Sequence, residues 1–166
     1  MMNITKSGIS HLAMRVAEAI TLLLLFCSVS LLIQPKPSQN NQTMNNKSSI
    51  LIHLSQGPEN PTVAALAFLI ARTAVENGHE VTLFFAGDAV QLMKDEVLNN
   101  LTGLGTGKLI EHYKVLKEAG CHFYLSGMSS KSRGITENDM NGKKVTFASP
   151  TVLLNLALEN DKMFTY

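Results

Sequence analysis

A polar turn in the C-terminal half of the chain carries the residues best suited to bind a ligand. The stretch from Ser126 to Ile135 contains four serines together with Lys131 and Arg133. Hydroxyls, cations and the free N–H groups of a helix start are the groups with which proteins bind anions. We therefore predict that Ser126, Ser129, Lys131 and Arg133 bind a small anion or an acidic partner group. In the alternative, Arg133 pairs with a nearby acid such as Asp88 and fixes the loop.

Gly57 and Asp88 lie in two other turns, each of which follows an apolar run typical of a buried strand. Ligands of parallel sheets bind outside the carboxyl ends of the strands, so we include both residues in the candidate site. A second interpretation of Asp88 is that its carboxylate caps the next helix. His112 has no Cys, Asp or second His at metal-site spacing, and we predict neither a metal ion nor a cofactor.

Thiol chemistry in this chain is limited to two cysteines, Cys27 and Cys121. Cys27 lies inside an apolar N-terminal run, so a processed chain keeps one thiol and no intramolecular disulfide. Cys121 opens a predicted strand that ends near Ser126, and a rise of ~3.3 Å per residue places the two about 16 Å apart. We predict that Cys121 is a buried small hydrophobic residue away from the site.

Two further kinds of site fit the residues poorly. A hydrolase with Ser126 as nucleophile is disfavoured, because Ser126-Gly127 lacks the G-x-S-x-G elbow and the strand residues His53 and His79 show no base-to-hydroxyl arrangement. The segment 99–108 resembles a phosphate loop but has Thr102 and Leu109 at positions that need Gly and Ser or Thr. We predict that it is a flexible connection.

Apolar runs and helical periods predict the elements that position these residues. Two short apolar runs flank a helix-periodic segment, a pattern typical of parallel strands joined by a crossover helix. That helix starts at Asn60-Pro61, ends at Asn77-Gly78 and has an apolar surface so wide that part of it is predicted to meet another subunit. The expected strands are Ser49–Leu54, His79–Phe85, Cys121–Leu125, Lys143–Phe147 and Lys162–Tyr166, with helices over Val63–Glu76, Lys108–Ala119 and after Ser149-Pro150.

The N-terminal segment predicts export. Lys6 and Arg15 precede fifteen uncharged residues, Ala19 to Ile33, so residues 1–33 are predicted to be a signal peptide or an uncleaved anchor spanning residues 16–33. Residues 34–48 are rich in Pro, Asn, Gln and Ser and are predicted to be a disordered linker before a domain over residues 49–166. We expect a periplasmic or otherwise extracytoplasmic location, with membrane contact only if the segment stays uncleaved.

Length and charge limit the function further. The chain has 166 residues, of which 45% are hydrophobic, enough for one core. Its net charge is +1, and eleven basic and twelve acidic residues lie from Lys47 onward. Because the basic residues do not cluster beyond pairs, a nucleic-acid partner is disfavoured.

Four motifs together resemble the DsrE/DsrF-like family over about Ser49 to Tyr166: the GPENPT turn with its Ala-rich helix, GHEVTLFFAGDAV, SGMSSKSRGI and the terminal DKMFTY. The resemblance implies an α/β fold, a three-layer α/β/α sandwich with a mainly parallel five-stranded sheet. It also implies assembly as a homotrimer or homohexamer. Relatives include sulfur-relay proteins, in which a cysteine after a middle strand accepts and passes on a persulfide.

The chain departs from the sulfur-relay pattern at one position. In sulfur-carrying relatives the cysteine stands seven places before the Arg of an Arg-Gly pair, and here that position is Ser126, counted from Arg133-Gly134. A hydroxyl cannot carry a persulfide, because the chemistry requires a thiolate. We predict an exported, oligomeric, non-catalytic protein that binds a small ligand or a sulfur-metabolism partner. The alternative is a sulfurtransferase that uses Cys121 or a partner's thiol.

Overall fold

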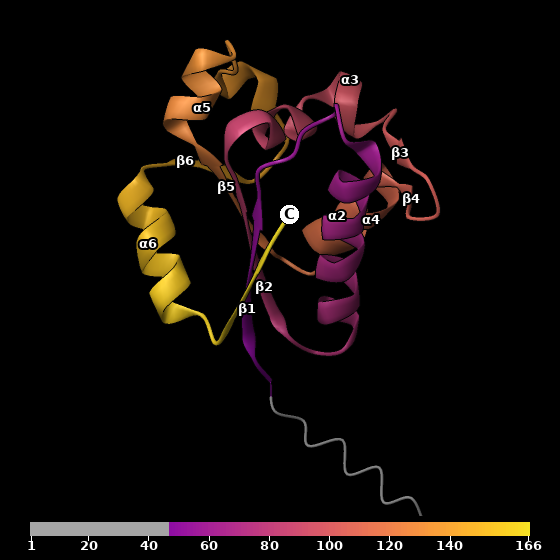
Figure 1. Ribbon diagram of the computed structural model, residues 1–166, viewed down its shortest axis with the longest axis vertical. Coiled ribbons are helices and arrows are strands. Elements are labelled where there is room, and N and C mark those ends of the chain that lie inside the picture. Colours follow the sequence, from indigo (N-terminus) through magenta and orange to yellow (C-terminus); the bar gives the residue numbers. More distant parts are fainter. Residues whose placement is uncertain (1–46) are drawn as a thin grey trace, which may run out of the picture. The chain divides into compact units, whose positions relative to one another are not determined.

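The computed structural model describes residues 47–166, which are drawn in colour in Figure 1. The predicted signal peptide or anchor and all but the end of the predicted linker lie outside the described residues. Within residues 47–166, none of the helices combines the length and the apolar character that a membrane span requires.

Five parallel strands form one sheet in the order β6-β5-β2-β1-β7. The strands are β1 (Ser49–Leu54), β2 (Glu80–Phe85), β5 (His122–Ser126), β6 (Val145–Ala148) and β7 (Lys162–Thr165). Each strand lies within about two residues of its predicted range. The predicted α/β fold with a mainly parallel five-stranded sheet is therefore confirmed.

Helices cover both faces of the sheet (Figure 1). α2 (Pro61–Glu76) and α4 (Leu109–Glu118) lie on one face, and α6 (Pro150–Glu159) lies on the other. Pro61 occupies the first turn of α2, and Gly78, with φ of 85°, ends the helix segment as predicted. Asn60 sits at the N-cap, where its side chain makes no capping hydrogen bond and its carbonyl oxygen accepts the N–H of Ala64 at 3.0 Å.

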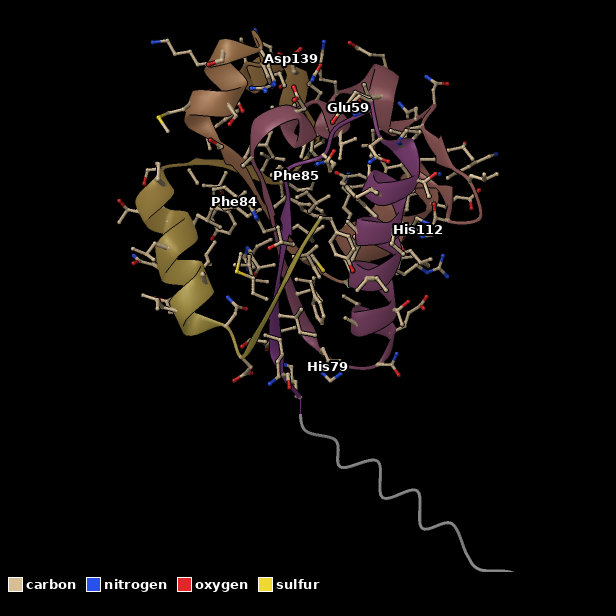
Figure 2. The ribbon with its side chains drawn as sticks, in the orientation of Figure 1. Glu59, His79, Phe84, Phe85, His112 and Asp139 are labelled. Carbon is tan, nitrogen blue, oxygen red and sulfur yellow. The ribbon has the colours of Figure 1, made fainter. Side chains whose placement is uncertain are left out.

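Neighbouring residues of one strand point into two different cores, as Figure 2 shows for Phe84 and Phe85. Phe85 belongs to the larger core, between the sheet and helices α2 and α4, where it packs on Phe68. Phe84 belongs to a smaller core under α6, which includes Leu51 and Ala148. α2 also contacts α4 and the short strand β3, so its wide apolar surface is largely occupied within the chain.

Short elements fill the connections. They are η1 (Gly87–Met93), α3 (Asp95–Leu98), β3 (Thr102–Gly103), β4 (Gly107–Lys108), α5 (Gly127–Ser132) and η2 (Glu137–Met140). The predicted flexible connection 99–108 is wrong in part, because β3 and β4 form an antiparallel hairpin. The buried ring of His112 stabilises the hairpin through Nε2, which lies 2.7 Å from the carbonyl oxygen of Thr106.

Candidate functional site

The carboxyl ends of β1, β2 and β5 meet at one edge of the sheet. Leu54 pairs in register with Phe85, and Phe85 pairs with Leu125, so the turns that follow the three strands start side by side. The N–H of Ala86 donates to the carbonyl of Leu54 at 2.8 Å and ties two of these turns together. The parallel topology thus brings Gly57, Asp88 and Ser126 to the same edge, as predicted from the strand pattern.

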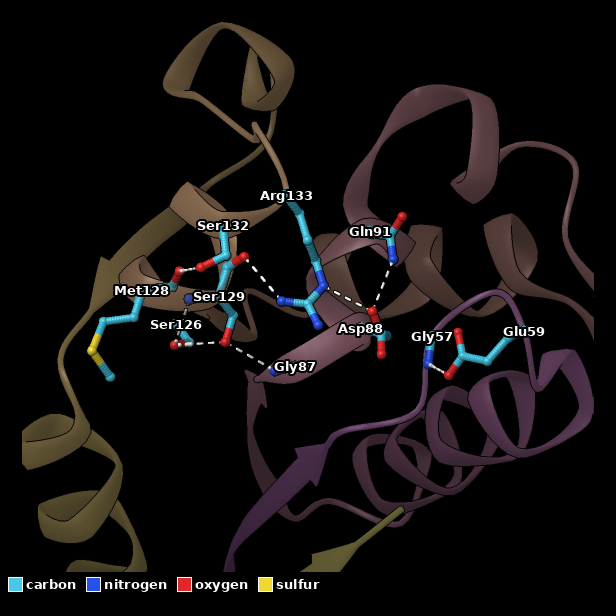
Figure 3. A network of polar contacts seen from close by, with 10 residues as sticks. All are labelled: Gly57, Glu59, Gly87, Asp88, Gln91, Ser126, Met128, Ser129, Ser132 and Arg133. Atoms are coloured by element: carbon cyan, nitrogen blue, oxygen red, sulfur yellow. Dashed lines mark hydrogen bonds and ion pairs between the residues drawn. The ribbon is translucent and has the colours of Figure 1, made fainter.

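A chain of hydroxyls links the turn after β2 to the start of α5 (Figure 3). The N–H of Gly87 donates to Ser129 Oγ at 3.0 Å, and Ser129 Oγ donates to Ser126 Oγ at 3.1 Å. Ser126 is the N-cap of α5, and its Oγ also accepts the N–H of Ser129 at 3.3 Å. Ser126 therefore has a structural role, since it begins α5 and joins it to the neighbouring turn.

The surroundings of Ser126 do not activate it as a nucleophile. Both partners of its Oγ are groups of Ser129, and neither is a base. His53 belongs to the α6 face of the sheet and contacts Phe84, with 6.2 Å between ring centroids. The Ser126 oxygen already accepts two hydrogen bonds and the residue is buried, with 8% of its surface exposed, so its own O–H is the capacity that remains for a ligand. The site is thus suited to an acceptor, such as an anion, more than to hydrolysis.

Arg133 and Asp88 form an ion pair above the hydroxyl chain. Arg133 Nε donates to Asp88 Oδ1 at 2.8 Å, and Arg133 Nη1 donates to the carbonyl of Ser129 at 3.3 Å. Asp88 also accepts from Gln91 Nε2 at 3.3 Å. The interpretation that Asp88 caps the next helix is wrong, because Ala86 is the N-cap of η1 and η1 has no side-chain cap. The Asp88 carboxylate instead pairs with the Arg133 guanidinium, as the alternative interpretation of Arg133 predicted.

Gly57 is the point at which the β1–α2 turn touches the turn after β2. A Cβ added to Gly57 would lie 2.5 Å from the carbonyl oxygen of Asp88 and 2.6 Å from Glu59 Oε2. The N–H of Gly57 donates to Glu59 Oε1 at 2.7 Å, a contact visible in Figure 3. Gly57 therefore serves the site by allowing two backbones to approach closely.

Lys131 is placed apart from the Ser126 hydroxyls. It lines an open depression of about 390 Å³ beside α5, together with Gly134, Glu137 and Phe147. Ser129 and Arg133, two and four residues away, lie in the hydroxyl and ion-pair network instead. The structure thus joins Gly57, Asp88, Ser126, Ser129 and Arg133 in one cluster and leaves Lys131 on a neighbouring surface.

Cys121 lies at the other end of β5, just before the strand begins. It is half-buried and lines a cavity of about 560 Å³, whose wall also includes His79 and His122. Burial raises the pKa of the Cys121 thiol to about 11, against a weaker opposing effect of a backbone hydrogen bond. Cys121 thus lies at the amino end of the sheet, away from the polar turn, as predicted, but it is half-buried and not fully buried.

Two members of the cluster were missed by reasoning from the sequence. The carboxylate of Glu59 accepts a hydrogen bond from the backbone N–H of Gly57, and the side-chain amide of Gln91 donates to the carboxylate of Asp88. The only sequence signal for Glu59 was an acid two residues after a turn glycine, a spacing that also suits a solvated side chain. Among residues 47–166, no group of three or more His, Cys, Asp or Glu side chains could hold a metal ion.

Comparison with known proteins places the fold and the family. The family model described as DsrE/DsrF-like matches residues 48–166. The crystal structure of the ychN protein from E. coli is similar, with a TM-score of 0.57 and 18% sequence identity over 72% of this chain and 99% of that chain. A search of curated proteins gave no match. The family model covers the whole described sheet with its helices, and the chain therefore belongs to the DsrE/DsrF-like family.

Proposed function

We propose that this protein is a non-catalytic, sulfur-relay-related binding or accessory member of the DsrE/DsrF-like family. One observation carries the proposal: the end of β5 holds the hydroxyl of Ser126 in an internal hydrogen-bond chain, whereas the thiol of Cys121 lies at the opposite end of the strand. Membership of the family relates the protein to sulfur relay. The residues at the turn after β5 support binding of a ligand or partner, and not carriage of sulfur.

The acidity of Cys121 supports the same conclusion. Because burial raises the pKa of Cys121 to about 11, this side chain is almost entirely in the thiol form at pH 7. The thiolate is the nucleophile in sulfur transfer, so this thiol is slow to attack a sulfane donor. Cys121 therefore fits a packing role better than the alternative role of a sulfur carrier.

Sulfur loading tests this proposal directly. We expect that the full-length protein, incubated with inorganic polysulfide at pH 7, gains no persulfide at Cys121, as measured by intact mass and by peptide mapping that separates Cys121 from Cys27. A Cys121→Ser variant controls for loading elsewhere in the chain. Stoichiometric sulfur on Cys121, at a rate fit for turnover, would overturn the non-catalytic proposal and favour the sulfurtransferase.

The ligand that this cluster supports is a small anion. The guanidinium of Arg133 donates to Asp88, and the hydroxyl of Ser126, whose oxygen accepts from Ser129, has an O–H that can also donate. Asp88 already neutralises Arg133, so an anion must compete with this carboxylate for the same guanidinium. The side chains of Arg133 and Asp88 are 28% and 51% exposed, which leaves the pair open to exchange with solutes. The cluster is thus a site in which Asp88 sets the affinity.

Removal of the Asp88 charge should expose this competition. We expect that Asp88→Asn binds inorganic sulfate or thiosulfate about tenfold more tightly than wild type, measured by isothermal titration calorimetry at low ionic strength. The matched control is Asp95→Asn, because Asp95 is also an exposed acid and pairs with Lys143 at 2.8 Å. Equal affinities in wild type and both variants, or binding that persists in Arg133→Gln, would contradict an anion site at Arg133.

Export and self-association complete the proposal. The basic start and apolar run of residues 1–33 support export to the periplasm or another extracytoplasmic space, with a signal peptide or an anchor over residues 16–33. Fractionation of cells that express the tagged full chain tests this location. Assembly as a homotrimer or homohexamer is supported by large apolar side chains that lie exposed on α6 and β7, namely Leu154, Leu158, Met163 and Phe164.

A further inference from the structure

The strand β7 forms an edge of the sheet, and no strand among residues 47–166 pairs with its outer side. Its four residues are all exposed, and its inner side pairs with β1, as Figure 1 shows in yellow. The N–H of Tyr166 donates to His53 at 2.9 Å, and the carbonyl of Tyr166 accepts from Ser55 at 2.7 Å. Because backbone groups alternate along a strand, Phe164 also faces β1, and Met163 and Thr165 direct their N–H and C=O groups outward. Such an edge is a template for another strand.

We propose that β7 pairs in antiparallel orientation with β7 of a second copy of this chain, which joins two sheets across a two-fold axis. The inference rests on the self-association in the proposed function and is independent of the anion site. A two-fold, self-complementary contact predicts an assembly with an even number of subunits. It therefore favours a dimer or a homohexamer built from such pairs over an isolated homotrimer.

The outward backbone groups define the register of this pairing. Met163 of one copy lies opposite Thr165 of the second copy, and the reverse pair is equivalent by symmetry. Each of these pairs exchanges two N–H···O bonds, so the outward groups of both residues are satisfied. Phe164 then lies opposite Phe164 of the second copy in a non-hydrogen-bonded pair, in which Cα atoms approach to about 4.5 Å and the side chains meet.

The side chains of β7 suit a second copy of the same strand. Met163 is 43% exposed and Phe164 is 45% exposed, on opposite faces of the sheet, so one pairing covers both. In the proposed register Lys162, the one charged residue of β7, faces Tyr166 of the second copy and not another lysine. Like charges are thereby kept apart, and the ammonium meets an aromatic side chain. Charge and apolar area are both compatible with self-pairing.

The neighbouring helix agrees with this arrangement. α6 has no buried residue, although six of its ten residues are Val, Leu or Ala. Leu154 is 59% exposed and Leu158 is 76% exposed. A helix that is apolar on several sides needs more than one covering surface. A two-fold axis at β7 brings the two α6 helices to the same face of the joined sheet, on which Met163 of both copies also lies beside Leu51.

The outward N–H of Thr165 provides a sharp test. Thr165→Pro removes this donor but leaves the hydrogen bonds to β1, which use Tyr166. Asp161 holds the start of β7 independently, because its carboxylate accepts the N–H of Ser49 at 2.8 Å. We expect that Thr165→Pro raises the dissociation constant of the two-fold assembly about 100-fold in sedimentation experiments on the full chain, whereas Thr165→Val, which keeps the N–H, leaves it within about threefold.

A side-chain variant gives an independent readout. Phe164→Lys should abolish the same assembly by placing two ammonium groups opposite each other, whereas Leu104→Lys should not, since Leu104 is 89% exposed at the tip of the β3–β4 hairpin. Circular dichroism verifies that each variant is folded. An assembly unchanged by Thr165→Pro and Phe164→Lys, or a trimer without a two-fold axis, would overturn the β7 interface but not self-association. A wild-type monomer at all concentrations would overturn both.

Discussion

The Ser126→Cys variant is expected to acquire sulfane sulfur that the wild-type protein does not. A thiolate at this N-cap would accept the N–H and the O–H of Ser129, as Ser126 Oγ now does. Hydrogen bonds to the charged form lower a pKa and burial raises it, and Ser126 is 8% exposed, so the two effects oppose each other at this position. We expect the hydrogen bonds from Ser129 to keep this thiol more acidic than Cys121, whose pKa burial raises to about 11. We expect the new thiol to react with iodoacetamide at pH 7 at least about 100-fold faster than Cys121.

Sulfur transfer to this variant can be followed by peptide mass mapping. The thiolate attacks a terminal sulfur of inorganic polysulfide, forms the persulfide bond and releases a polysulfide shorter by one sulfur atom. Both variants are made in a Cys121→Ser background, so that sulfur added to Cys121 does not contribute to the measured mass. Ser132→Cys is the matched control, because Ser132 lies on the same helix and its Oγ donates to the carbonyl oxygen of Met128. Equal reactivity of Ser126→Cys and Ser132→Cys would show that the end of β5 does not activate a thiol.

Gly57→Ala is expected to destabilise the protein by about 2–3 kcal/mol and to disrupt the anion site. The added methyl would lie 2.5 Å from the carbonyl oxygen of Asp88, and this backbone cannot move freely. Its turn is bound to β1 through Ala86 and to α5 through Gly87. Relief of the clash must therefore break one of these contacts or shift the turn before α2. Urea unfolding followed by circular dichroism measures the loss of stability.

Gly127→Ala is the control for this prediction. Gly127 also lies at the carboxyl edge of the sheet, but a Cβ there would meet its nearest contact, the carbonyl oxygen of Ala148, at an ordinary 3.6 Å. Since alanine is favoured over glycine within a helix, the free energy of unfolding should stay unchanged or rise by up to about 1 kcal/mol. A Gly57→Ala protein as stable as Gly127→Ala would show that the turns around Asp88 are not held in close contact.

The strands and long helices could be predicted because their signals are local. The apolar runs of β1 and β2 and the helical period of α2 follow from burial against a sheet, which the order of residues encodes directly. Parallel topology then places the turns after β1, β2 and β5 at one edge, and for this reason Gly57, Asp88, Ser126 and Arg133 could be named together. The hairpin of β3 and β4 was not predicted, and in the structure the carbonyl oxygen of Thr106 in its loop contacts His112 Nε2.

Partner choice within the site could not be predicted in the same way. A carboxylate at a strand-to-helix turn suits either a cap or an ion pair, and Asp88 took the pair because α5 brings Arg133 within 2.8 Å. Lys131 lies in the last turn of α5 and Arg133 is its C-cap, yet their side chains face different surroundings. The direction of each side chain depends on how α5 packs against the turn after β2. These two segments lie many residues apart along the chain.

The amino-acid sequence by itself determined that this is an α/β chain and that Ser126, not a cysteine, stands at the end of its third long strand, because residue identity and apolar period require no coordinates. The tertiary structure alone decided that the N–H of Gly87 donates to the Ser129 hydroxyl, that Asp88 neutralises Arg133 and that β7 is an edge strand of the sheet. These features arise between segments distant in sequence. Hydrogen bonds and ion pairs of this kind act over about 3 Å, and only folding brings their partners to that distance.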